Sequence, residues 1–308
     1  MAEVDMSDFQ KILDSRPLIG EKTKTSYLST YKKLTRELAK PIRNSTQKQI
    51  LETIDELSDK LTTRNVLINM AIIVFQLYEK DTGLLLKRRE KNSLNNKRVR
   101  IETNHAKLKY LPGRQKLLNH LEDLYKEKRW EEFIINYLLI YLNVRNQDLN
   151  LLITKKGMKI KEGAKGNKSF LKDNFLVVRS RDITLFRSNY KTYSTYGTKT
   201  NSIQSKKFRK AVLGFIEEQQ ADGDFTPLLH KANGQRISEG FLHEYINKRT
   251  FDNLNESDYM KIVVNYVDEK GNLNNLRQLA SNRGTDVNTI IENYNLKFEL
   301  PPNKVEEL

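Results

Sequence analysis

Apolar residues in the first part of the chain recur every three or four positions, which is the spacing of side chains along one face of a helix. The first such stripe consists of Tyr27, Tyr31, Leu34 and Leu38. Pro41 ends this stripe, Ser45–Thr46 can cap a second helix with an apolar face over residues 50–57, and a third stripe ends at Gly83. The pattern therefore predicts a small bundle of helices.

The second part of the chain changes its periodicity twice. A helical pattern over Gln115–Lys126 is followed by Trp130–Leu142, which is apolar on nearly every side and predicts a buried helix. Phe175–Val178 and Ile183–Phe186 are short β-branched or aromatic runs typical of strands, and the extended pattern continues over Tyr190–Ile203. Helical patterns return over Lys206–Gln219, Glu239–Lys248, Ser257–Val267, Leu273–Ser281 and Val287–Tyr294. We expect a mostly helical α+β fold with a small antiparallel β-sheet.

A polar and basic stretch separates the two parts. Between Lys87 and Lys116 the chain has eleven Lys and Arg residues against two acids, and Pro112–Gly113 lies near the end of the stretch. A chain of 308 residues suits two ordinary domains. We therefore expect a helical domain over residues 1–86, a basic linker over residues 87–114 and an α+β domain over residues 115–308.

The balance of charge indicates the class of partner. The chain has 54 Lys and Arg against 39 Asp and Glu, a formal net charge of +15, which favours a polyanion. A membrane is not expected, because the apolar run Ile134–Leu142 is interrupted by Asn136 and is far shorter than the ~20 residues of a membrane span. Residues 1–10 contain three acids and no apolar run, so no secretory signal is expected. The expected location is intracellular: nucleus, cytoplasm or virion.

Other functional classes are disfavoured by what the sequence lacks. There is no cysteine, which excludes disulfides and thiolate metal sites, and the four histidines are scattered. We expect no metal, no other cofactor and no small-molecule substrate. The segment from Lys155 to Lys210 has sixteen Lys and Arg against three acids, with tyrosines interleaved among them. Such a segment suits contact with phosphates such as those of double-stranded DNA, the alternative being a merely solvated basic face.

The predicted DNA contacts lie in the two basic stretches. They are Lys87, Arg88, Arg89, Lys91, Lys97, Arg98, Arg100, Arg187, Lys199, Lys206 and Lys207. A linker this basic is also what a protein that closes around a DNA duplex requires.

A polar turn with the sequence Asn-Val-Arg-Asn-Gln-Asp-Leu, Asn143–Leu149, follows the predicted buried helix. This turn resembles the G-x-R-x-x-E-L turn that carries the first catalytic arginine of tyrosine recombinases and of the related type IB topoisomerases. Arg145 stands at the arginine position, and Asp148 replaces the acid. On the residues alone, a salt bridge between Arg145 and Asp148 is the simpler interpretation.

Three further motifs follow in the order of that family. Asn189–Thr192 with Tyr196–Gly197 resembles the β-hairpin that carries its catalytic lysine, and Phe225–Leu229 resembles the stretch before its late helices. Gly284–Tyr294 is similar to the segment that ends in its nucleophilic tyrosine. The resemblance covers about residues 20–300, and the hairpin pattern is most similar to recombinase-like proteins of large DNA viruses.

The resemblance implies a catalytic set of Arg145, Lys191 and Tyr294. The tyrosine hydroxyl attacks a DNA phosphate and forms a 3′-phosphotyrosyl link, which conserves energy for rejoining. The arginine stabilises charge on the non-bridging oxygens, and the lysine protonates the departing 5′ oxygen. On the residues alone Tyr294 has a second interpretation as plain core packing, because Ile291 and Val287 lie three and seven positions before it.

Three groups of the family's site, its second arginine and both of its histidines, are replaced in this chain. The family's H-x-x-R motif aligns with Ser257–Met260, about thirty residues before the tyrosine, and Thr285 takes the place of a second histidine. An alignment on Leu276–Arg277 leaves 294 − 277 = 17 positions, which is too short. The weaker candidates for the missing cation are Arg277, Arg283 and Lys261.

Three functions remain open at this point. The leading interpretation is a tyrosine recombinase or integrase that clamps duplex DNA between its two domains and cuts and rejoins it, with a homo-oligomer possible on DNA. The second is a catalytically degenerate clamp that serves genome packaging, replication or regulation. The third is a basic structural protein that binds RNA or acidic partners.

Overall fold

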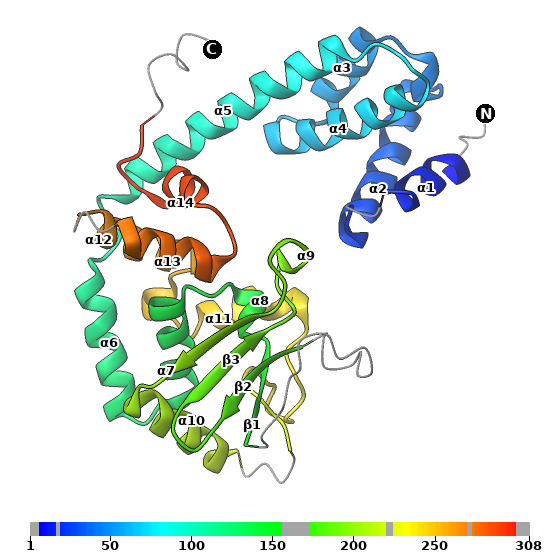
Figure 1. The fold of residues 1–308 in the computed structure, drawn as a ribbon. Helices are drawn as coiled ribbons and strands as arrows, with labels where there is room; N and C mark the ends of the chain where they lie inside the picture. Colours follow the sequence, from blue (N-terminus) through cyan, green and yellow to red (C-terminus); the bar gives the residue numbers. More distant parts are fainter. Residues whose placement is uncertain (1–5, 17–18, 156–172, 220–223, 270–272, 300–308) are drawn as a thin grey trace. The chain divides into compact units, whose positions relative to one another are not determined.

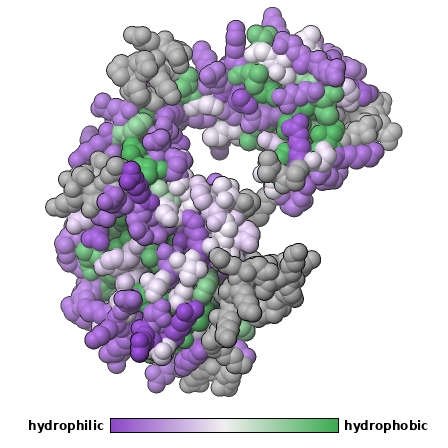
Figure 2. All heavy atoms as spheres, viewed as in Figure 1, coloured by the Kyte–Doolittle hydropathy of each residue, from purple (hydrophilic) through white to green (hydrophobic). Residues whose placement is uncertain are grey.

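The computed structural model of this chain describes residues 6–16, 19–155, 173–219, 224–269 and 273–299. It contains two compact units, one centred on residues 1–103 and the other on residues 104–298. Hydrophilic residues cover much of the surface that is visible in Figure 2. No helix in the described part of the chain combines the length and the apolar character that crossing a membrane requires.

The first unit is helical, as the sequence predicts. Its helices are α1 (Met6–Asp14), α2 (Glu21–Leu38), α3 (Gln47–Leu57), α4 (Leu61–Leu77) and α5 (Gly83–Lys107), shown in blue to cyan in Figure 1. Helix α3 begins with a capping box, in which the Thr46 side chain accepts from the Gln49 backbone N–H and the Gln49 side chain accepts from the Thr46 N–H. Helix α4 supplies half of the buried core residues of this unit, with Ile68, Met70 and Ala71 fully buried.

Helix α5 covers most of the stretch expected as a basic linker over residues 87–114. Residues 87–107 are part of this helix of 25 residues. Neither glycine nor proline occurs between Leu84 and Leu111, so nothing in this stretch breaks a helix, and Pro112–Gly113 stands just after it. The basic side chains of residues 87–107 are therefore carried on an α-helix.

The second unit has the mostly helical α+β fold that the sequence predicts. Its first half contains α6 (Arg114–Lys126), α7 (Trp130–Tyr137), the π-helical turn η2 (Leu138–Leu142), α8 (Asn146–Leu149), β1 (Leu151–Thr154), β2 (Asn174–Val178), β3 (Ile183–Arg187), α9 (Tyr193–Tyr196), β4 (Lys199–Ile203) and α10 (Lys206–Glu218). Its second half contains β5 (Thr226–Pro227), α11 (Leu242–Asn247), α12 (Glu256–Glu269), α13 (Leu273–Arg283) and α14 (Val287–Tyr294).

The sheet has the strand order β4-β3-β2-β1-β5 (Figure 1). The expected antiparallel strands are β2, β3 and β4, but β1 pairs with β2 in parallel, so the sheet is mixed. Strand β1 follows α8 directly and its sequence pattern did not single it out. The extended pattern over Tyr190–Ile203 is a strand only from Lys199, because Tyr193–Tyr196 forms the helical turn α9.

The main core of the second unit lies between the sheet and helices α6, α7 and α10. Leu176 and Leu185 contribute from β2 and β3, and Trp130 and Phe133 contribute from α7. Helices α12, α13 and α14 share a separate cluster that includes Met260, so the segments that carry the late motifs form a subassembly of their own.

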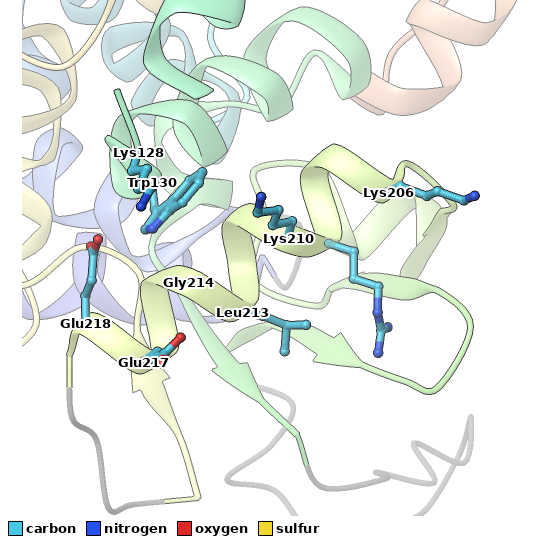
Figure 3. A pocket seen from close by; sticks show the side chains of 9 residues that line it. Lys128, Trp130, Lys206, Lys210, Leu213, Gly214, Glu217 and Glu218 are labelled. Carbon is cyan, nitrogen blue, oxygen red and sulfur yellow. The ribbon is translucent and has the colours of Figure 1, made fainter. Parts of the chain in front are cut away.

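Close packing between α7 and α10 requires a glycine. A Cβ atom at Gly214 would lie 2.5 Å from Nε1 and 2.8 Å from Cε2 of Trp130, whose indole lies beside Gly214 in Figure 3. We expect Gly214→Ala to destabilise the protein by about 1–3 kcal/mol, the usual cost of overpacking a core, even though alanine favours a helix.

Chemical denaturation of both variants against the wild type measures this effect. The control is Gly240→Ala, because a Cβ atom at Gly240 meets nothing within 4 Å. A Gly214→Ala protein as stable as the wild type would contradict the close contact.

Candidate active site

The turn that carries Arg145 is shaped by a left-handed residue. Helix α7 continues into the π-helical turn η2, and Asn143 then adopts φ 52° and ψ 39°, a conformation that asparagine tolerates better than most residues. The Asn143 side chain donates to the carbonyl oxygens of Leu139 at 3.3 Å and Ile140 at 3.4 Å. The chain thus leaves the buried helix at a defined angle, and Arg145 follows in an extended conformation.

The buried carboxylate of Asp148 holds this turn through a hydrogen bond to its backbone. Its Oδ2 accepts from the backbone N–H of Arg145 at 3.1 Å and from Nη1 of Arg187 at 3.2 Å. The side chains of Asp148 and Arg187 are only 3% and 1% exposed. Burial raises the pKa of the Asp148 carboxyl, and the charge of Arg187 opposes that rise.

Arg187 is therefore a correction to the set of expected DNA contacts. Its guanidinium also donates to the Asn282 carbonyl at 2.7 Å and to Oδ1 of Asn201 at 3.0 Å. A side chain this buried and this well bonded does not reach a DNA phosphate. Its charge neutralises Asp148, so Arg145 keeps its own guanidinium free of the salt bridge that the sequence alone suggested.

Arg283 and Tyr294 meet beside this turn. Nη1 of Arg283 donates to the carbonyl oxygens of Asn143 and Val144, both at 3.2 Å. Nη2 donates to Oη of Tyr294 at 3.2 Å and to a carboxylate oxygen of Glu256, and the guanidinium carbon lies 5.4 Å from the centre of the Tyr294 ring. The side chain of Arg283 is 4% exposed.

The ring and the hydroxyl of Tyr294 have different surroundings. It is partly buried and packs with Val287 and Ile291 against the cluster of α12, α13 and α14. Its hydroxyl, however, meets the guanidinium of Arg283. The aromatic ring is held by apolar packing, and the hydroxyl is placed in a cationic environment.

The same charged and polar groups act electrostatically on Arg145. Burial, followed by the charge of Arg283, lowers the pKa of Arg145, and Asp148, Tyr294 and Glu256 oppose this effect. Nη1 of Arg145 is buried and has no hydrogen-bond partner among the described residues. Arg283 thus joins the Tyr294 hydroxyl to the backbone just before Arg145, and Arg145 retains an unused donor.

Lys199, rather than Lys191, is the lysine that lies within the influence of the Arg145 and Arg187 charges. Nζ of Lys199 donates to the Ser281 carbonyl and lies 5.0 Å from the centre of the Tyr196 ring. Burial, followed by the charges of Arg187 and Arg145, lowers the pKa of Lys199. Lys191 is exposed in the connection between β3 and β4, and no hydrogen bond joins it to Arg145 or Tyr294 among the described residues.

Gly284 brings that connection against the turn between α13 and α14. It has φ 68°, and a Cβ atom there would lie 2.6 Å from Oγ1 of Thr192, which donates to the Gly284 carbonyl at 2.8 Å. A glycine is thus required at this position for two reasons, the positive φ and the close approach. The contact holds the β3–β4 connection next to the segment that carries Arg283 and Tyr294.

The other candidate cations lie elsewhere. Arg277 is exposed on α13. Lys261 is buried beside Asp258, with an Nζ–Oδ1 distance of 3.9 Å, and burial together with the charge of Lys107 lowers the pKa of Lys261 to about 8. Met260, at the position of the family's second arginine, is buried in the core. Of the three substitutes named from the sequence, Arg283 is the one that meets Tyr294.

The predicted DNA contacts differ in their solvent exposure and in whether they already pair with an acidic residue. Lys87, Lys91, Arg98, Arg100, Lys206 and Lys207 are exposed. Arg88 pairs with Asp55 at 2.7 Å, and Lys207 pairs with Glu122 at 2.6 Å. Arg98 lies 3.1 Å from Glu102, so part of this positive charge is already compensated.

Comparison with known proteins gives little beyond the geometry. No family model matches the sequence, and no curated protein sequence matches it. Among solved structures, the chain is similar to the XerA recombinase, with a TM-score of 0.38 and 13% sequence identity over 98% of this chain and 95% of that one.

Proposed function

We propose that this protein binds duplex DNA and cleaves and rejoins its strands through Tyr294. The observation that carries the proposal is that Arg283 bonds both the Tyr294 hydroxyl and the backbone just before Arg145. A tyrosine hydroxyl bonded to one arginine, with a second arginine on the adjoining turn, suits attack on a phosphodiester, because arginines stabilise the charge that develops on the phosphate oxygens.

In the proposed reaction the Tyr294 oxygen attacks a DNA phosphorus, and its proton passes to solvent. The bond from phosphorus to the 5′ oxygen breaks, and a 3′-phosphotyrosyl bond replaces it. Arg283 donates to the attacking oxygen and lowers the cost of its negative charge. One phosphodiester is exchanged for another, so the reverse reaction rejoins the strand.

Lys199 is assigned as the acid that protonates the departing 5′ oxygen. Its pKa is lowered by burial and by the charges of Arg187 and Arg145, which brings the ammonium closer to the range in which it releases a proton readily. Lys191, the lysine that the resemblance selects, is exposed and is better suited to contacting the DNA backbone.

The exposed cations of α5 are the second part of the proposed DNA contact. Lys87 and Lys91 lie about one turn apart on the same side of this helix, and Arg100 is exposed on its other side. Cations on a helix can neutralise several phosphates, and each neutralised phosphate releases counterions into solution. Binding of this kind does not depend on base sequence.

We expect duplex binding to weaken steeply with salt, with a log–log slope of about −0.9 for each phosphate contacted. Changing Lys87, Lys91 and Arg100 together to glutamate should lower the affinity at least about tenfold and flatten the slope, whereas Lys32, Lys33 and Lys48 changed to glutamate alter the net charge equally elsewhere. Fluorescence anisotropy over a salt series measures both effects. Equal losses in the two triple variants would contradict a specific contact by α5.

A second candidate function is duplex binding without strand cleavage. It is favoured by Met260, which is buried where the resemblance places a second arginine, and by the near-complete burial of Arg283. The two candidates differ in one outcome, because only cleavage leaves protein covalently attached to DNA.

A further inference from the structure

The Glu256 carboxylate lies within the cationic centre, which consists of Arg145, Arg283 and the groups bonded to them. One of its oxygens accepts from Nη2 of Arg283, and the other accepts from the backbone N–H of Asn146 at 2.6 Å. Glu256 is the first residue of α12, and Asn146 directly follows Arg145. A single carboxylate thus bridges the two segments that carry the arginines.

This carboxylate is not required to hold Arg283 in place. Nη1 of Arg283 is already fixed by the carbonyl oxygens of Asn143 and Val144. Only Nη2, the nitrogen that also meets the Tyr294 hydroxyl, bonds to Glu256. Glu256 therefore occupies the side of the guanidinium that faces the tyrosine.

The balance of charge around Arg145 and Arg283 also indicates that Glu256 compensates their positive charge. Arg187 and Asp148 neutralise one another in a buried pair, which leaves Arg145 and Arg283 as two like charges close together. Glu256 compensates that pair in the free protein. Burial alone would lower the pKa of Arg283, but Glu256 and Tyr294 outweigh it and raise the pKa, so the guanidinium stays charged.

A phosphodiester offers the same bonding as this carboxylate. It carries one negative charge and two free oxygens, which can accept from an arginine N–H and a backbone N–H together. The buried, unpartnered Nη1 of Arg145 is a further donor for it. The side chain of Glu256 is 17% exposed and lies at a helix start, so it can turn outward without disturbing the core.

We propose that the Glu256 carboxylate occupies the position of a DNA phosphate and is displaced when a phosphate binds between Arg283, Asn146 and Arg145. The inference rests on the proposed function for the identity of the anion. It adds that the free protein carries its own competitor for that anion. Binding therefore exchanges one negative group for another instead of filling an open site.

The test compares duplex affinity of Glu256→Gln and Glu244→Gln, both made in a Tyr294→Phe protein so that no cleavage takes place. Glutamine keeps the size of the side chain but has no charge and only one accepting oxygen. We expect Glu256→Gln to bind duplex at least about tenfold more tightly, with a salt slope steeper by about 0.9. Glu244 pairs with Lys248 on the surface and provides the same change of charge, with little effect expected.

Thermal unfolding gives a second, independent measurement. Glu256→Gln should have a lower Tm than its parent without ligand, because the two arginines then repel one another uncompensated. Inorganic phosphate in the millimolar range should raise that Tm more than it raises the Tm of the parent. Weaker or unchanged duplex binding by a folded Glu256→Gln would overturn the proposal and would make Glu256 a positioning residue.

If Glu256→Gln does not fold, Glu256→Asp replaces it, because aspartate is too short to bridge both donors. Tighter binding by a smaller factor supports the displacement, and equal or weaker binding overturns it. Failure of the proposed cleavage is seen separately, since it appears as the absence of a covalent adduct with the wild type. The affinity comparison is valid whichever way that experiment ends.

Discussion

We expect Tyr294→Phe to abolish the covalent attachment to DNA that the proposed cleavage requires, and to leave duplex affinity within about twofold of the wild type. The substitution removes one oxygen, and the ring keeps its packing against Val287 and Ile291. The cost in stability is about 1 kcal/mol, because Nη2 of Arg283 loses one of its two partners. A duplex nicked beside the scissile phosphate traps the adduct, which is then detected on a denaturing gel.

The matched control for this experiment is Tyr266→Phe, on the exposed side of α12. It should form as much adduct as the wild type. Adduct formation by Tyr294→Phe would place the nucleophile at another residue. If the wild type forms no adduct on any duplex while it still binds DNA, the second candidate function is correct.

Arg187→Met should lower the free energy of unfolding by about 3–5 kcal/mol, because it leaves the buried Asp148 carboxylate without its charged partner. Arg98→Met removes an exposed pair with Glu102 and should cost less than about 1 kcal/mol. Adding Asp148→Asn to Arg187→Met should restore part of the loss. Urea denaturation of the four proteins measures these differences.

The Arg187→Met deficit should also depend on pH in a defined direction. Burial already raises the pKa of Asp148, and the loss of Arg187 raises it further. The folded state then holds a proton that the unfolded state releases, so stability falls as the pH rises above the ordinary range of an aspartate. A deficit that grew toward acidic pH would contradict the buried contact between these two residues.

The sequence located the arginine turn because its chemistry is local. A buried helix, a left-handed Asn143 and an acid three residues after Arg145 all lie within one short stretch. The fold class could be predicted for the same reason, since helical and strand periodicities are read within single segments. The parallel pairing of β1 with β2 could not, because pairing joins segments that are distant along the chain.

Lys199 and Arg187 show where local sequence patterns fail to predict the surroundings of a side chain. Lys191 lies in the connection between β3 and β4, whereas Lys199 is the first residue of β4, and the helical turn α9 lies between them. Arg187 ends a strand in which every residue is buried, so a charge that reads as surface is in fact internal. Its partner Asp148 is 39 positions away and gives no signal in the neighbouring sequence.

The contacts that build the centre span most of the second unit. Glu256 bonds Asn146 across 110 positions, and Arg283 bonds Asn143 across 140. Closing loops of this length costs entropy that local helices do not have to overcome, so we expect these contacts to form later than the helices. A chain still emerging from the ribosome carries the Arg145 turn long before Arg283 and Tyr294 exist. Tyr294, Arg283 and the Arg145 turn thus come together only when nearly the whole second unit has been synthesised.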